Sequence, residues 1–179
     1  MFRIVTPDRF VTSPWKNGGG VTHEILRREA FGKWLWRLSI AEVEVDGPFS
    51  RFERLSRILT VIEGNGVDLH TPDGVLQARA LKPVRFSGDL PVESRMVDGP
   101  IRDLNVIYDP EQVEAEVTII ECAGSFAAGP GETGFLNLRG RVTAQSDDVP
   151  VGAFAFGTDG EIDLAPGAAG LLVMLRERR

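Results

Sequence analysis

Residues 33–45 read KWLWRLSIAEVEV, and this stretch decides the fold class. Large apolar side chains occupy every second position from Trp34 to Ile40, and Arg37 and Ser39 stand between them. Alternation with a period of two is typical of a β-strand whose faces meet different surroundings. The stretch therefore predicts a long strand with Arg37 and Ser39 on the face opposite the tryptophans.

Turn residues punctuate the rest of the chain. The 20 glycines and 11 prolines recur about every ten residues, which is typical of a β-sandwich or barrel. Further strands are predicted at 57–62, 67–70, 75–81, 104–108, 117–121, 135–138, 142–145, 153–156 and 170–175. Only residues 110–114 favour a helix, of one or two turns. The fold class is all-β.

A short internal similarity links the two halves of the chain. Residues 58–66 and 135–140 each read as a strand that ends in a glycine turn, and a hairpin and a Pro/Gly turn follow each. A repeat of this kind predicts a duplicated barrel. The expected organisation is one compact unit over 1–179, with halves at about 1–110 and 111–179.

Composition restricts the classes of partner. The chain has 179 residues, 42% of them hydrophobic and 26% charged, which is typical of a globular protein with a core. A net charge of −6 without a basic cluster argues against nucleic acid. No apolar run reaches membrane-spanning length. One cysteine, Cys122, and the absence of a leader-like start predict a reducing, cytoplasmic location.

A polar, glycine-rich cluster lies at residues 15–20, which read WKNGGG. Three successive glycines allow backbone amides to converge on an anion such as a carboxylate or phosphate. The sequence is not a phosphate-binding P-loop, because no Gly-Lys-Ser/Thr closes it. A tight turn between two strands explains the glycines equally well. Beyond them, Thr22 and Glu24 share one face of a predicted strand.

Arg37 is a candidate ligand-binding residue. An inward arginine is costly to bury unless it is paired, so it implies a carboxylate from the protein or from a ligand. Glu24, Asp46 and Asp103 are the candidates within the chain. An ordinary ion pair, or an outer face in water, remains the alternative.

Asp103 and Asn105 share one strand face, and Leu104 and Val106 lie on the other. Pointing inward, Asp103 and Asn105 would offer hydrogen bonds to a bound molecule. An edge strand that turns both side chains toward water is the alternative.

The sequence offers little for metal or nucleophilic chemistry. A cupin metal site needs three histidines and a carboxylate, but only His23 and His70 occur, and His23 and Glu24 point to opposite faces of a strand. No metal or cofactor is expected. Cys122 ends an apolar strand and is predicted to be a buried, inert thiol. Ser39 has no evident histidine base.

Five motifs follow one another over about residues 10–108. They are WKNGGGVTHEI at 15–25, WRLSIAEV at 36–43, DGPFSRF at 46–52, RILTVIEGNG at 57–66 and DLNV at 103–106. Together they resemble the HutD/Ves family of bacterial cupin-like proteins, and agreement beyond residue 115 is limited to pattern. One departure is the sequence IYDP at 107–110, where the family continues into an arginine-rich stretch that could hold an anion.

The resemblance implies a double-barrel (bicupin, RmlC-type) fold without an established enzymatic activity or metal-ligand histidines. HutD-type members are associated with histidine utilisation and with sensing or buffering an intermediate such as N-formylglutamate; Ves-type members are linked to stress responses. The resemblance places a ligand-binding pocket at Asn17, Gly19, Gly20, Thr22, Glu24, Arg37, Ser39, Arg57, Asp103 and Asn105.

Three functions are therefore considered. The first is non-catalytic binding of a small anionic metabolite by the glycine loop, Arg37 or Arg57. The second is a metal-independent enzyme, an isomerase or hydrolase, with Glu24, Asp103 or His23 as acid or base. The third is a protein-interaction scaffold, for which exposed aromatic residues at Phe49 and Phe52 would be required. A homodimer is left open.

Overall fold

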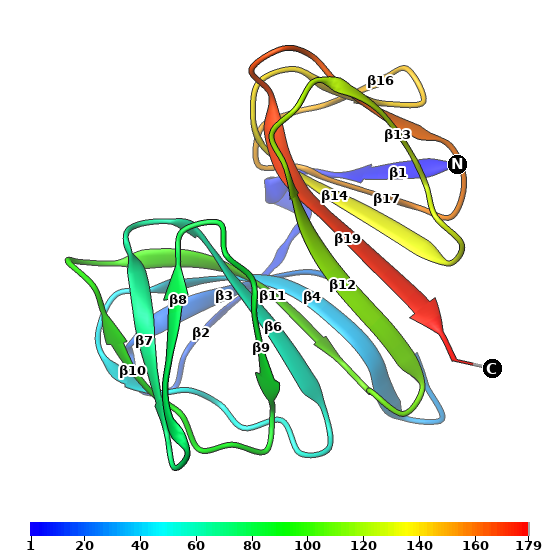
Figure 1. Ribbon diagram of the computed structural model, residues 1–179. Coiled ribbons are helices and arrows are strands. Elements are labelled where there is room, and N and C mark those ends of the chain that lie inside the picture. The colour runs from blue at the N-terminus through cyan, green and yellow to red at the C-terminus, as the bar shows by residue number, and fades with distance from the viewer. Residues whose placement is uncertain (179) are drawn as a thin grey trace. The chain divides into compact units, whose positions relative to one another are not determined.

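The computed structural model describes residues 1–178 and consists almost entirely of antiparallel strands (Figure 1). A single 3-10 turn, η1 (Pro7–Arg9), is the only helical element in the described residues. Within that range no helix has the length and apolar character needed to cross a bilayer. The all-β prediction is confirmed.

The chain divides into two units. One is Val11–Glu111, and the other combines Met1–Phe10 with the chain from Gln112 onward. The first ten residues belong to the second unit because β1 pairs with β17. A division at about residue 110 places them in the first half, whereas pairing between residues distant in sequence places them in the other unit.

Two sheets form the unit Val11–Glu111. The six-stranded sheet has the order β2 (Val11–Pro14), β3 (Gly20–Ala30), β4 (Lys33–Val43), β11 (Ile101–Tyr108), β6 (Ser56–Glu63) and β9 (Val84–Ser87). The four-stranded sheet has the order β5 (Gly47–Pro48), β10 (Glu93–Met96), β7 (Gly66–Thr71) and β8 (Gly74–Arg79). Their core includes Leu59, Val61, Val67, Leu69 and Ala78, all fully buried.

The other unit also has two sheets. The five-stranded sheet has the order β1 (Phe2–Val5), β17 (Phe154–Gly157), β14 (Glu132–Arg139), β19 (Ala169–Glu177) and β12 (Val113–Ile120). The four-stranded sheet has the order β13 (Gly124–Ala127), β18 (Glu161–Leu164), β15 (Val142–Ala144) and β16 (Asp147–Val149). Phe135, Ala153, Ile162 and Ala168 lie in its core.

The strands that alternation and turn residues predict are all present. One helix prediction is wrong: residues 110–112 form a turn, and 113 and 114 already belong to β12. Pro110 is compatible with the start of either a helix or a turn, so the local signal was ambiguous. Pairing of β12 with β19 along its whole length decides for the strand.

The internal similarity corresponds to equivalent strands. β6 and β14 have the same sequence of buried and exposed positions from end to end. Each is followed by a glycine with positive φ, at Gly64 (φ 91°) and Gly140 (φ 78°). At Gly64 a side chain is also excluded, since a Cβ would stand 2.6 Å from the Pro100 carbonyl oxygen. Duplication of one barrel stays a prediction that these features support.

Candidate functional site

Strand register brings distant polar residues together on the inner face of the six-stranded sheet. Asn105 on β11 stands opposite Ser39 on β4, and Ser39 stands opposite Glu24 on β3. One step along the strands, Ile107 lies between Arg37 on β4 and Arg57 on β6. Side chains two residues apart share a face, so these groups form one polar strip across the sheet.

A cavity of about 40 Å³ opens on this strip, and a hollow of about 470 Å³ adjoins it. Both are lined by Trp15, Thr22, Arg37 and Ser50, so the larger space is the mouth of the smaller one. The inner cavity is also lined by Ser39, Ala41, Phe49, Phe52, Arg57, Asn105 and Ile107. The inner cavity has room for a few water-sized groups, and its mouth is in the size range of small-molecule sites. The two spaces together suit a small ligand.

Arg57 is the buried cation of this cavity, with 6% of its surface exposed. Its Nε donates to Asn105 Oδ1 at 2.7 Å. Its guanidinium carbon lies 4.7 Å from the ring centre of Phe49 and 5.5 Å from that of Phe86. No carboxylate within residues 1–178 forms an ion pair with Arg57, so its charge is held by an amide and two aromatic faces.

Asp103 provides the nearest opposing charge, through Asn105. Its side chain is fully buried, Oδ1 accepts a hydrogen bond from Asn105 Nδ2, and Oδ2 has no partner. Burial raises the pKa of Asp103 to about 6, against the lowering effects of Arg57 and of the Asn105 hydrogen bond. Burial lowers the pKa of Arg57 to about 10, and the nearby Arg37 lowers it further while Asp103 raises it.

Arg37 has its own carboxylate. Its Nε donates to Glu24 Oε2 at 2.7 Å, and its guanidinium carbon lies 5.2 Å from the Trp34 ring centre. Arg27 approaches the other oxygen of Glu24, with 3.7 Å between Nε and Oε1. Of the three partner candidates for Arg37, the structure selects Glu24. Arg37 nevertheless lines both the cavity and its mouth.

The glycine cluster is a turn. The Gly18 amide donates to the Trp15 carbonyl at 3.0 Å, and the Gly19 amide donates to Asn17 Oδ1 at 3.0 Å. At Gly20 a Cβ would stand 2.3 Å from the Glu42 carbonyl oxygen, so close strand packing requires glycine there. Two of the three glycine amides are therefore already used within the loop, which corrects the expectation that they converge on an anion.

The predicted site residues divide into three groups. Thr22, Arg37, Ser39, Arg57 and Asn105 line the inner cavity, and Asn17 lines the mouth. Glu24 and Asp103 stand behind these residues and contact Arg37 and Asn105, respectively. Gly19 and Gly20 line neither space.

Sequence reasoning missed the aromatic wall and the mouth. Trp15 lines both spaces, and its Nε1 donates to Thr22 Oγ1 at 2.8 Å. Lys16 places an ammonium group at the mouth. Both stand in the WKNGGG motif that was singled out for its glycines, whereas the residues of this motif that line the hollow are Trp15, Lys16 and Asn17.

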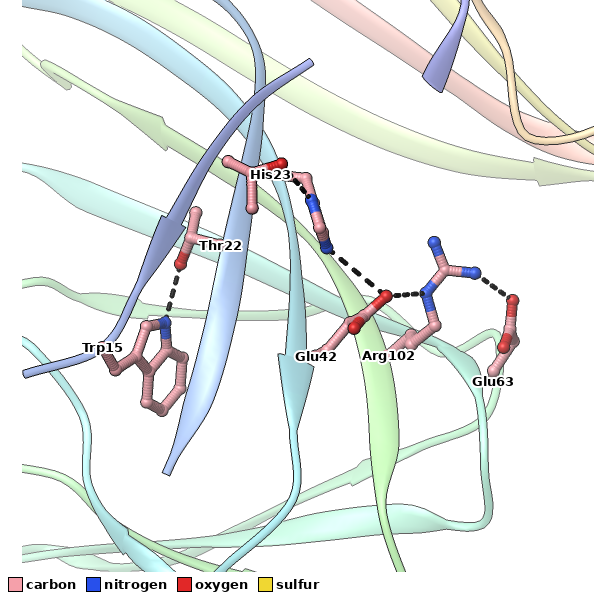
Figure 2. Close-up of polar contacts among 7 residues, drawn as sticks. Trp15, Thr22, His23, Glu42, Glu63 and Arg102 are labelled. Atoms are coloured by element: carbon pink, nitrogen blue, oxygen red, sulfur yellow. Dashed lines mark hydrogen bonds and ion pairs between the residues drawn. The ribbon is translucent and has the colours of Figure 1, made fainter. Parts of the chain in front are cut away.

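A second polar network lies on the opposite face of the sheet (Figure 2). His23 Nδ1 is 2.9 Å from Thr12 Oγ1, and its Nε2 is 3.4 Å from Glu42 Oε1. Arg102 Nε lies 3.3 Å from the same Glu42 oxygen, and its Nη1 lies 2.5 Å from Glu63 Oε1. The network crosses the sheet strand by strand, and its partly exposed ion pairs are of the kind that stabilises a fold only weakly.

Other chemistry finds little support in the described residues. Within that range no three His, Cys, Asp or Glu side chains gather in an arrangement that could hold a metal ion. Cys122 is exposed, so its prediction as a buried thiol is wrong; it follows the end of β12 in a loop. Phe49 is buried, at 6% exposure, and packs edge-on against Trp15. The exposed aromatic pair that a scaffold would present at Phe49 and Phe52 is therefore absent.

Fold and site together define an all-β protein of the cupin type with a polar, arginine-lined pocket. Residues 8–168 match the model of the family described as HutD, and the chain belongs to that family.

Relatives support this assignment. The chain is 31% identical to HutD from Pseudomonas fluorescens SBW25, with a TM-score of 0.88 and both chains covered completely. It is 44% identical over 109 residues to an uncharacterised 21.2 kDa protein in the hutC 3' region of Pseudomonas putida, which covers 58% of this chain and 56% of that protein. Over 110 residues it is 32% identical to the protein Ves of Escherichia fergusonii, and the match covers 60% of this chain and 58% of Ves.

More distant structures share the fold. The bacterial pirin YhhW of Escherichia coli aligns with a TM-score of 0.70 at 11% identity, covering 97% of this chain and 98% of that one. At this identity the likeness concerns the fold alone.

Proposed function

We propose that this protein binds a small carboxylate-bearing metabolite in the Arg57 cavity without converting it. The observation that carries the proposal is a buried guanidinium without an ion pair among the described residues. Burying an unpaired charge is costly unless something compensates it, and a bidentate carboxylate is the natural complement of a guanidinium. Nε is used by Asn105, so the Nη groups remain to meet a ligand.

The shape of the pocket favours a ligand with one small charged end and a longer polar body. An anionic or formyl group would enter the inner cavity beside Arg57. The remainder would occupy the mouth, where Lys16, Asn17 and Arg37 offer further polar contacts. Ser39 and Thr22 would supply hydroxyl groups between the two spaces.

The family suggests the pathway. Membership of HutD, and a relative encoded in the hutC 3' region, favour a role in histidine utilisation. The related HutD structure from Pseudomonas fluorescens SBW25 is one of a formate condition. We infer that N-formylglutamate is the metabolite to test first, and that the protein senses or buffers it in the cytoplasm.

Binding is preferred over catalysis for a geometric reason. An acid or base must reach the proton that it transfers. Glu24 and Asp103 stand behind the lining residues, and His23 lies on the other face of the sheet. None of these three candidates for a catalytic acid or base lines the cavity.

Isothermal titration calorimetry with N-formylglutamate tests the proposal. Arg57→Met keeps the length of the side chain and removes its charge. Loss of a charge-assisted hydrogen-bond pair is expected to weaken binding by roughly 10- to 150-fold, because such bonds contribute about 1.5–3 kcal/mol. Arg95→Met, at an exposed position of β10, is the matched control.

Three outcomes would overturn the proposal. One is that the wild-type protein binds neither N-formylglutamate nor any other carboxylate from histidine breakdown. Another is equal affinity in wild type and Arg57→Met. The third is turnover of the bound ligand, which would favour a metal-independent enzyme instead.

A further inference from the structure

Asp103 does not line the ligand cavity, but it is a fully buried ionisable group directly behind the lining residue Asn105. It occupies β11, between Ala41 on β4 and Val61 on β6, and no part of its surface is exposed. Its Oδ2 has no hydrogen-bond partner. A carboxylate with one unpartnered oxygen in an apolar setting is poised to accept a proton.

Asn105 joins Asp103 to Arg57. Its Nδ2 donates to Asp103 Oδ1 while its Oδ1 accepts from Arg57 Nε. The amide is thereby fixed in one orientation, because a flipped amide would set two donors or two acceptors against each other. The negative and the positive charge are thus separated by one oriented amide and cancel across it.

One further charged group, Arg37, lies close enough to lower the pKa of Arg57, and it has a counter-ion of its own. On the inner face of β4 the charged residue is Arg37, and Glu24 on β3 neutralises it at 2.7 Å. Arg57 is the charged residue that faces inward from β6. The buried positions of the facing four-stranded sheet are Gly66, Val67, Leu69, Ala78 and Ser94, none of which titrates.

An anion bound to Arg57 would upset the balance, because two negative charges would then share one buried cation. Protonating Asp103 restores neutrality at the lowest cost, since Arg57 must stay charged to hold the ligand. We propose that the pocket takes up one proton on Asp103 for each anion that it binds, so that it captures the equivalent of a neutral acid. The proton comes from solvent, and no bond of the ligand breaks.

The sign of the pH dependence follows by linkage. Without ligand, burial raises the pKa of Asp103 to about 6, and a bound anion raises the pKa further. Below about pH 6 the proton is already present and affinity is insensitive to pH. Above it, each binding event must draw a proton, so the dissociation constant rises by up to about tenfold per pH unit until the pKa of the complex is reached.

Formate is the probe, because it is the smallest carboxylate and stays ionised throughout this range. Calorimetric titration at pH 7 in Pipes and in imidazole, two buffers with different ionisation enthalpies, yields the number of protons taken up. We expect about one proton per formate bound in the wild-type protein. Asp103→Asn should bind formate with no proton uptake and with a dissociation constant independent of pH. Asp98→Asn, the same change in an exposed turn, should behave as wild type.

The inference rests on the proposed function, and the outcomes separate the two. If formate binds, Arg57→Met weakens binding and the heat shows no dependence on the buffer, the proton coupling is wrong and the anion site stands. If formate binds equally well to Arg57→Met, or does not bind at pH 6, both the anion site and the proton coupling are wrong. The proton count comes from the wild-type protein, so the test does not depend on a variant that folds.

Discussion

Replacing Asp103 with asparagine is expected to stabilise the unit Val11–Glu111 more at pH 8 than at pH 5. The carboxyl group is fully buried, and burial raises its pKa from an ordinary value of about 3.9 to about 6. A raised carboxyl pKa favours the protonated native state. The native protein therefore loses stability as pH rises between these two values, and the loss is complete above about pH 6.

The magnitude follows from the two pKa values. Full ionisation of Asp103 lowers the free energy of unfolding of the wild-type protein by about 3 kcal/mol, and roughly half of this loss has occurred at pH 5. Asparagine does not ionise and keeps an oxygen that can accept from Asn105. The difference in stability between variant and wild type is thus expected to shift in favour of the variant by roughly 1–2 kcal/mol from pH 5 to pH 8.

Urea unfolding followed by tryptophan fluorescence measures this shift. All three tryptophans, Trp15, Trp34 and Trp36, lie in Val11–Glu111, so the signal reports the unit that contains Asp103. The exposed Asp98→Asn serves as a control and is expected to differ from wild type by the same amount at both pH values. A stability difference for Asp103→Asn that stays constant, or moves toward wild type as pH rises, would refute the assignment of a raised pKa.

Further predictions concern the turn and the two polar faces. Gly20→Ala should lower the free energy of unfolding by roughly 1–3 kcal/mol or more, measured by thermal unfolding, since its Cβ would stand 2.3 Å from the Glu42 carbonyl oxygen. Gly18→Ala, with open space and a φ of 71°, should cost about 1 kcal/mol, and an equal loss in both variants would contradict this account. Asn17→Ala should cost about 1 kcal/mol by removing the acceptor for the Gly19 amide, with urea unfolding as the measure. Glu42→Gln, although at the centre of the outer network, should change stability by less than about 1 kcal/mol, and a larger loss would show that this network is more than a partly exposed set of ion pairs.

The sequence predicted the strands and their inner face well, because alternation and turn residues act locally. Arg37 and Ser39 do lie on the cavity side, and Asp103 and Asn105 do point inward. The alternative of an edge strand for the last two is wrong, since β11 lies between β4 and β6. Five of the ten predicted site residues line the inner cavity.

The failures share one cause. Glycine is compatible with a ligand-binding loop, a tight turn and a close approach between strands. The structural role of the glycines at 18–20 therefore could not be assigned from the sequence. Whether Cys122 is buried depends on where its strand ends, and the first ten residues pair with a strand far along the chain. Local pattern carries no information about such long-range pairing.

By itself the sequence determined the all-β class, the punctuation by turns and the face on which each polar residue stands, since these depend on neighbours within a few positions. The tertiary structure alone decided how the charges are paired. Strand register gives Arg37 the carboxylate of Glu24, leaves Arg57 with an amide and aromatic rings, and buries Asp103 behind that amide. The properties of a charge depend on what lies within a few ångströms, and here those neighbours come from strands far apart in the chain.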